Sequence, residues 1–181
     1  MTDHSACIPT VSVVASASDH EDLRRLVSDY VATWYRPGHP FSAHDQQLLA
    51  TLAQQHTPPS GASLLARADS APVGCVLMRA HPDEPDAAEL RKMYTVPSVR
   101  RRGVGYALLV EVARIAQRAG YRQLLLDVAK DRTAAVALYR SHGFVEASGV
   151  AAPPGFLTLA RHVAGLTRTT APRARVRAGA T

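Results

Sequence analysis

A basic, glycine-containing loop between a strand and a helix is the sequence feature that most restricts the fold of this chain. The β-rich run 87–95 leads through this loop to a helical pattern over 103–118, and an apolar run at 123–128 follows. The apolar positions of the helix lie along one face, at Val104, Leu108, Val112 and Ile115. Strand, helix and strand in such close succession predict an α/β or α+β fold with a mixed sheet.

Further strands and helices are expected on both sides of this unit. The segment before it is predicted to contain a strand at 11–14, a core-facing helix opened by the capping box Ser18–Glu21, a weaker helix at 45–53, and a hairpin of strands 63–67 and 73–79. The segment after it is predicted to contain a helix at 133–141 and strands at 144–146 and 156–161. The order is β-α-α-β-β-β-α-β-α-β-β, in one domain spanning residues 1–166.

Charge and hydropathy limit the classes of partner. The formal net charge is +6, but the last fifteen residues carry four arginines and no acid, so subtracting these four leaves +2 for residues 1–166. We expect residues 167–181 to be a basic, disordered tail, and nucleic acid to be an unlikely partner. The apolar runs fall far short of the ~20 residues of a membrane span. No secretory signal is visible, and a cytoplasmic location is therefore expected.

Cysteine and histidine show no metal-binding pattern. The chain has two cysteines and eight scattered histidines, without an HExxH or CxxC motif. We therefore expect no metal, and Cys75 is interpreted as a small core residue.

The loop Val99–Ala107 is predicted to bind an anion. The first turn of a helix offers unpaired N–H donors and a partial positive charge. Gly103 and Gly105 lack the Cβ atoms that would hold an anion away, and the arginines at 100–102 add forked donors.

Two other interpretations of the loop remain. It is a solvated basic turn that merely enters a helix, or it belongs to a dinucleotide-binding fold, since Asp127 lies 22 residues beyond Gly105. Leu108 at the third small position and the residues 97–102 between strand and glycine count against the second interpretation.

The loop contains the pattern Arg100-x-x-Gly103-x-Gly105. This pattern matches the signature (Gln/Arg)-x-x-Gly-x-(Gly/Ala), and the sequence thereby resembles the GNAT superfamily of acetyl-CoA-dependent N-acetyltransferases. The run Ala88–Tyr94 resembles the fourth strand of that fold, and Ala135–Phe144 resembles its second conserved block. The resemblance covers about residues 10–162.

The resemblance implies a mixed sheet of six to seven strands flanked by about four helices, with a splay between strands 4 and 5. It implies acetyl-CoA as co-substrate, with the loop amides around the pyrophosphate and the backbone of strand 4 along the pantetheine. The cofactor-binding residues would be Met93, Tyr94, Thr95, Arg100, Arg101, Arg102, Gly103, Val104, Gly105, Tyr106 and Ala107. Arg101 departs from the family, because it stands where a third glycine is common. This is tolerable if Arg101 keeps a negative φ.

Acetyl transfer needs a base, an oxyanion donor and an acid. By resemblance, Glu89 is the catalytic base, directly or through water, the Met93 N–H is the oxyanion donor, and Tyr139 is the acid. The alternative for Glu89 is a surface carboxylate paired with Arg91 or Lys92, and the alternative for Tyr139 is a core aromatic.

Acceptor binding is expected from Trp34, Tyr35 and Phe41, which could equally pack at a helix end. The predicted function is N-acetylation of a primary amine of a small molecule in a ternary complex. Protein or peptide N-acetylation, and a non-catalytic acetyl-CoA-binding regulatory module, are the alternatives, and a homodimer is possible.

Overall fold

The computed structural model describes residues 9–34 and 43–163 of the chain, and these ranges hold seven strands and four α-helices. The strands are β1 (Thr10–Val13), β2 (Ala62–Ala68), β3 (Ala71–Ala80), β4 (Ala87–Thr95), β5 (Gln123–Ala129), β6 (Val145–Glu146) and β7 (Phe156–His162). The helices are α1 (Ala17–Trp34), α2 (Ala43–Gln55), α3 (Val104–Arg118) and α4 (Thr133–Ser141), with a 3₁₀ turn η1 at Pro97–Val99. The predicted order of elements is confirmed.

The seven strands form one mixed sheet in the order β1-β2-β3-β4-β5-β7-β6. Among these described strands only β4 and β5 pair in parallel, and every other neighbouring pair is antiparallel. A helical crossover is what a parallel pair requires, and α3 supplies it. A dinucleotide-binding fold has a mostly parallel sheet, so the dinucleotide interpretation is wrong. The side chain of Asp127 accepts a hydrogen bond of 2.6 Å from the Thr158 hydroxyl on β7.

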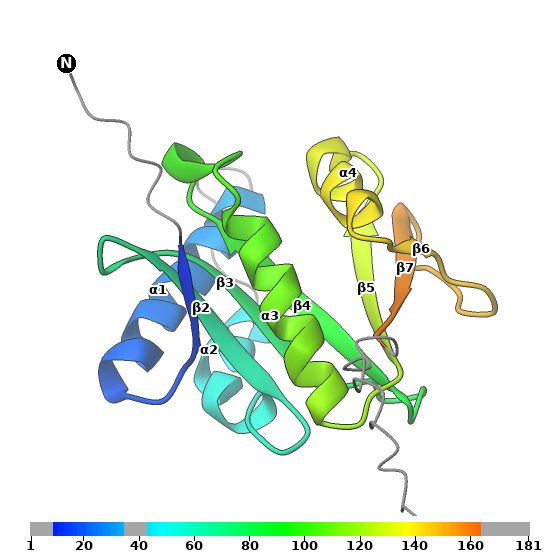
Figure 1. Ribbon diagram of the computed structural model, residues 1–181, viewed down its shortest axis with the longest axis horizontal. Helices are drawn as coiled ribbons and strands as arrows, with labels where there is room; N and C mark the ends of the chain where they lie inside the picture. The colour runs from blue at the N-terminus through cyan, green and yellow to red at the C-terminus, as the bar shows by residue number, and fades with distance from the viewer. Residues whose placement is uncertain (1–8, 35–42, 164–181) are drawn as a thin grey trace, which may run out of the picture.

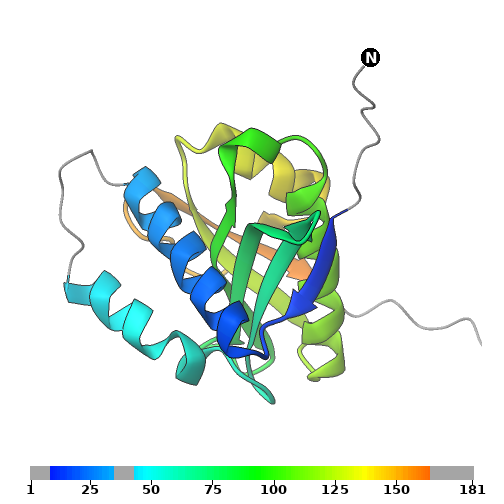
Figure 2. The same ribbon diagram turned by 90° about the vertical axis from the view of Figure 1, so that its left-hand side faces the viewer.

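Helices cover both faces of the sheet. Figures 1 and 2 show α3 on one face and α1 and α2 on the other. The face under α3 holds the larger core, which includes Leu108, Val112 and Phe144. The face under α1 holds a second core, which includes Leu26 and Cys75.

Cys75 is a core residue, as predicted. The side chain is 0% exposed, and burial raises the pKa of its thiol to about 12. A thiol with so high a pKa remains protonated and unreactive at neutral pH.

The start of α1 differs from the prediction. The capping box is Ser16 with Asp19: the Ser16 hydroxyl accepts from the Asp19 N–H at 3.0 Å, and the Asp19 carboxylate accepts from the Ser16 N–H at 3.0 Å. The predicted Ser18–Glu21 box is therefore wrong, because two overlapping Ser-x-x-acid patterns occur and the earlier one forms.

The predicted hairpin is confirmed with a tighter turn. Ala68 pairs with Ala71, so the loop is only Asp69-Ser70, and both residues have positive φ, 47° and 67°. Two central residues with positive φ match the right-handed twist of the flanking strands.

Two further features concern the whole chain. None of the helices in the described ranges combines the length and apolar character that a bilayer crossing needs. The predicted tail at 167–181 lies outside the described residues.

Candidate active site

The sheet opens between β4 and β5. These strands pair only from Ala87 to Glu89 on β4, although β4 continues to Thr95 and β5 to Ala129 (Figure 1). On the other side of β4, the register with β3 shifts between Cys75 and Leu77, where β4 carries one extra residue. Lys92 lies in this bulge with φ of 49°. The predicted splay is confirmed, and Glu89 lies at its apex.

Met93 follows Lys92 in the bulge, and it has no register partner on β3 or β5. Its side chain packs toward the first turn of α3, since a Cβ added to Gly105 would lie 3.4 Å from the Met93 Cε. The neighbouring Tyr94 pairs with Cys75 and turns its ring into the second core, where it meets Tyr30 edge-on at 6.3 Å. The bulged backbone of β4 therefore lies close to the start of α3.

The start of α3 is open to an anion. Gly103 is the N-cap residue with φ of 82°, and no side chain caps the helix. Glycine adopts this backbone conformation without the steric cost that a Cβ brings, and a Cβ built there would meet no atom within 4 Å. The first intrahelical bond to Gly103 comes from the Ala107 N–H, so the preceding amides of the first turn have no intrahelical acceptor.

The direction in which a Cβ at Gly105 would point differs from the expected one. A Cβ at this position would point at Leu138 on α4, with its Cδ2 atom at 3.0 Å, rather than into the open space before the helix. Gly105 thus allows α3 and α4 to approach closely.

The three loop arginines are exposed. Arg100 donates from Nε to the Thr95 carbonyl at 3.1 Å, which ties the loop to the end of β4. Arg101 has φ of 64°, so the condition of a negative φ fails. The backbone keeps the left-handed conformation that a glycine would favour here, at a cost of about 1–2 kcal/mol for a residue with a Cβ.

The remaining loop residues, Val104 and Tyr106, face in opposite directions. Val104 is buried in the larger core, whereas Tyr106 is 58% exposed and packs edge-on against His142 at 4.7 Å.

Glu89 lies in a cluster of opposite charges. Its carboxylate accepts from Arg79 Nε at 2.7 Å and lies 3.6 Å from Arg91 Nε. Arg91 is one of the two partners that the alternative interpretation names, whereas Arg79 is not predicted. All three side chains are about a fifth to a third exposed, so solvent and small molecules reach them.

Tyr139 is a largely buried phenol on α4. It is 9% exposed and packs edge-on against Phe144 with centroids 5.7 Å apart. Burial raises the pKa of the phenol, and the nearby phenol of Tyr30 on α1 raises it further. The phenol is therefore protonated at neutral pH, and the raised pKa makes it a weaker acid than an exposed tyrosine.

The side chains of the predicted acceptor-binding residues lie outside the described part of the chain. Trp34 is the last residue of α1, but its side chain is outside what is described, and Tyr35 and Phe41 lie outside the described residues. Tyr30 is predicted only as a core position, yet Lys92 Nζ lies 5.3 Å over its ring.

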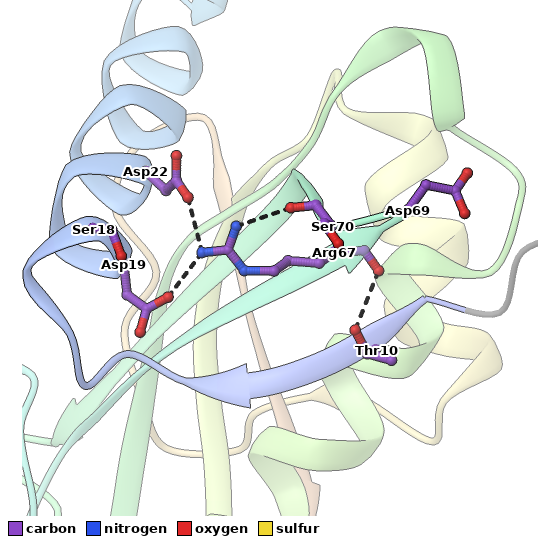
Figure 3. Close-up of a pocket in the computed structure, with 7 residues that line it drawn as sticks. All are labelled: Thr10, Ser18, Asp19, Asp22, Arg67, Asp69 and Ser70. Carbon is purple, nitrogen blue, oxygen red and sulfur yellow. Dashed lines mark hydrogen bonds and ion pairs between the residues drawn. The ribbon is translucent and has the colours of Figure 1, made fainter.

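A separate pocket lies near the start of α1 (Figure 3). It has a volume of about 730 Å³ and includes Asp19, Asp22 and Arg67. Arg67 forms ion pairs of 2.8 Å with both aspartates. This pocket lies beside β1, at the far edge of the sheet from the splay, so the two sites are distinct.

The described residues contain no candidate metal site. Within residues 9–34 and 43–163, no group of three His, Cys, Asp or Glu side chains is arranged to hold a metal ion.

Known proteins share this architecture. The Acetyltransferase (GNAT) family matches residues 25–144. An uncharacterised N-acetyltransferase of Schizosaccharomyces pombe is 30% identical over 137 residues, covering 75% of this chain and 82% of that protein. An aminoglycoside N(6')-acetyltransferase type 1 of Salmonella enteritidis is 26% identical, covering 71% and 94%. A GNAT-family acetyltransferase structure from Staphylococcus aureus superposes with a TM-score of 0.68 at 17% identity, covering 85% and 99%.

A splayed mixed sheet with an uncapped, arginine-flanked helix start defines an acyltransferase fold of this kind. The chain belongs to the GNAT family of acetyltransferases, and it is an acyltransferase.

Proposed function

We propose that the protein transfers the acetyl group of acetyl-CoA to the primary amine of a small molecule by direct attack in a ternary complex. The observation that carries this proposal is the proximity of two backbone features. The unpartnered Met93 of β4 packs toward the first turn of α3, whose start has no side-chain cap. A ligand that needs hydrogen bonds along a strand and at a helix N-terminus fits both.

The diphosphate of coenzyme A is the part that suits the start of α3. Its oxygens would accept from the amides between Arg102 and Ala107, with Gly103 leaving space, and Arg100 and Arg101 would add positive potential. The pantetheine would lie along the backbone of Met93, Tyr94 and Thr95. Because the Arg100 side chain already donates to the Thr95 carbonyl, we expect the backbone of Met93 to make the stronger contact with the pantetheine.

Bound acetyl-CoA supplies the thioester, and the protein supplies three groups around it. Glu89 would take the proton from the attacking amine, directly or through water. The Met93 N–H would stabilise negative charge on the carbonyl oxygen. Tyr139 would give its proton to the departing sulfur. Glu89 and Met93 both come from β4, at the apex of the splay and at the bulge, and Tyr139 comes from α4.

Two variants test this assignment in a thiol-release assay with acetyl-CoA and a panel of amines. Glu89→Gln and Tyr139→Phe should each lower kcat by about 100-fold or more, the usual size of a general acid–base contribution. Glu111→Gln is the control for the first variant, since Glu111 is also paired with an arginine, at 3.1 Å, but on α3. Tyr121→Phe is the control for the second. Full kcat in Glu89→Gln at every pH tested would remove Glu89 from the mechanism, and full activity of Tyr139→Phe would remove Tyr139.

The same assay separates the competing functions. Turnover of peptides but of no free amine would favour a peptide N-acetyltransferase. Tight acetyl-CoA binding without turnover of any amine would favour a regulatory module.

A further inference from the structure

The charged cluster at the splay has an excess of positive charge. Arg79, Glu89 and Arg91 come from adjacent positions of β3 and β4: Arg79 is the register partner of Glu89, and Arg91 follows two residues later on the same face of the strand. Lys92, at the bulge, adds a further positive charge over the Tyr30 ring.

The negative charges described nearby do not balance this excess. Asp29 on α1 acts electrostatically on Cys75. Counting it with Glu89 leaves three positive groups against two negative ones. His56 is 1% exposed and interacts electrostatically with Arg79, Arg91 and Glu89. Burial lowers the pKa of His56 to about 4, so its imidazole is uncharged at neutral pH. The acceptor side of the described site is therefore electropositive.

An acceptor amine must reach Glu89 from this side of the sheet. Ala88 and Leu90, the neighbours of Glu89 along β4, point into the core under α3 and are 0% and 5% exposed. Glu89 points to the opposite face, where its side chain is 21% exposed. An amine approaching Glu89 therefore passes the two guanidinium groups.

Both guanidinium groups retain donors. The contacts of Arg79 and Arg91 with Glu89 use only their Nε atoms, and no hydrogen bond from their Nη atoms to another described residue is present. Each terminal pair of N–H groups has the planar geometry that binds carboxylates through two parallel hydrogen bonds.

Resting on the proposed function, we infer that the acceptor is a primary amine that also carries a carboxylate, of the amino-acid class. The Nη groups of Arg91 and Arg79 bind the carboxylate, and the amine lies at Glu89. A polycationic acceptor such as an aminoglycoside, the substrate class named for one relative, is repelled by this cluster. The site is thus selective through attraction of one acceptor class and repulsion of the other.

The test uses pairs of acceptors that differ only in the carboxylate: α-amino acids and the corresponding α-amino amides, with an aminoglycoside and a polyamine beside them. The wild-type protein should prefer the acid to its amide by about 10- to 100-fold in kcat/KM, the range expected for hydrogen bonds to a charged group. The aminoglycoside and the polyamine should be the poorest acceptors.

Arg91→Gln should lower the acid-to-amide ratio several-fold, because one of the two guanidinium groups is lost, while the short Arg79–Glu89 pair stays in place. The matched control is Arg114→Gln, which removes an arginine paired with Glu111 on α3 and should leave the ratio unchanged. Equal or better turnover of amides, polyamines or aminoglycosides would overturn this inference while leaving the acetyltransferase proposal standing. Absence of thiol release with every amine, or failure to bind coenzyme A, would overturn the proposed function itself.

Discussion

Gly74 on β3 lies directly beneath the first turn of α3 and sets how closely that turn approaches the sheet. A Cβ built on Gly74 would lie 2.9 Å from the Tyr94 carbonyl oxygen, 2.9 Å from Val104 Cγ1 and 3.2 Å from Leu108 Cδ1. The Tyr94 oxygen is a backbone atom, so it cannot be relieved by a change of rotamer. We therefore expect Gly74→Ala to push the start of α3 away from the sheet.

The expected magnitude follows from two opposing effects. Overpacking a close-packed core costs about 1–3 kcal/mol. Alanine in place of glycine lowers the conformational entropy of the unfolded chain, and this offsets about 0.5–1 kcal/mol of the overpacking cost. We expect Gly74→Ala to lower the free energy of unfolding by about 1–2 kcal/mol, which is about 2–8 °C in Tm for a domain of this size.

Urea unfolding followed by circular dichroism measures this change, with a lower midpoint and an unchanged m-value. Val104→Ala provides the internal control, since it removes the Cγ1 atom. The double variant should recover only part of the cost, because the Tyr94 oxygen remains, with a coupling free energy of about 0.5–1 kcal/mol. A Gly74→Ala variant as stable as the wild type would refute the expected clash. Strictly additive effects of the two changes on the free energy of unfolding would refute it as well.

Two further predictions concern stability. Arg101→Gly should raise the free energy of unfolding by about 0.5–1 kcal/mol, because it relieves the left-handed backbone at φ of 64°; a destabilised variant in the same urea assay would contradict this. The pKa of His56 is about 4 in the folded protein, against an ordinary value of 6.5 for an exposed histidine, so the unfolded state binds the proton first as the pH falls. The contribution of neutral His56 to the free energy of unfolding is complete above pH 6.5 and declines between pH 6.5 and 4. Between pH 7 and pH 5, the free energy of unfolding of the wild type should therefore fall by about 2 kcal/mol more than that of His56→Leu. Equal losses in the two proteins would show that His56 is not the group responsible.

Local patterns make much of the fold predictable. The bounds of β4, α3 and α4 agree with the sequence to within a residue, and α3 and α4 have clear helical periodicity and a glycine just beyond their last residue. The start of α1 is mispredicted because Ser16 and Ser18 both begin a capping pattern, and Asp19 of the pattern that forms also pairs with Arg67, which is far away in the sequence.

The candidate site is predictable only where it is local in sequence. The helix start at Gly103 and the family positions of Glu89 and Tyr139 follow from motifs. The pairing of Glu89 with Arg79 depends on the register between two strands, which no local pattern fixes. The closeness of Gly105 to Leu138 could not be predicted, because Leu138 is on a helix far away in the sequence. The positive φ of Arg101 contradicts a residue-by-residue expectation, since the loop conformation as a whole imposes it.

The proposed function depends above all on the binding of a diphosphate at the uncapped first turn of α3. Calorimetric titration of the wild-type protein with coenzyme A and, separately, with pantetheine, which lacks the diphosphate, tests it most directly. We predict that coenzyme A binds about 100-fold or more tighter than pantetheine, because charge-assisted hydrogen bonds to the phosphates are lost with the latter. Equal affinity for the two compounds, or no binding of coenzyme A at millimolar concentration, would contradict it.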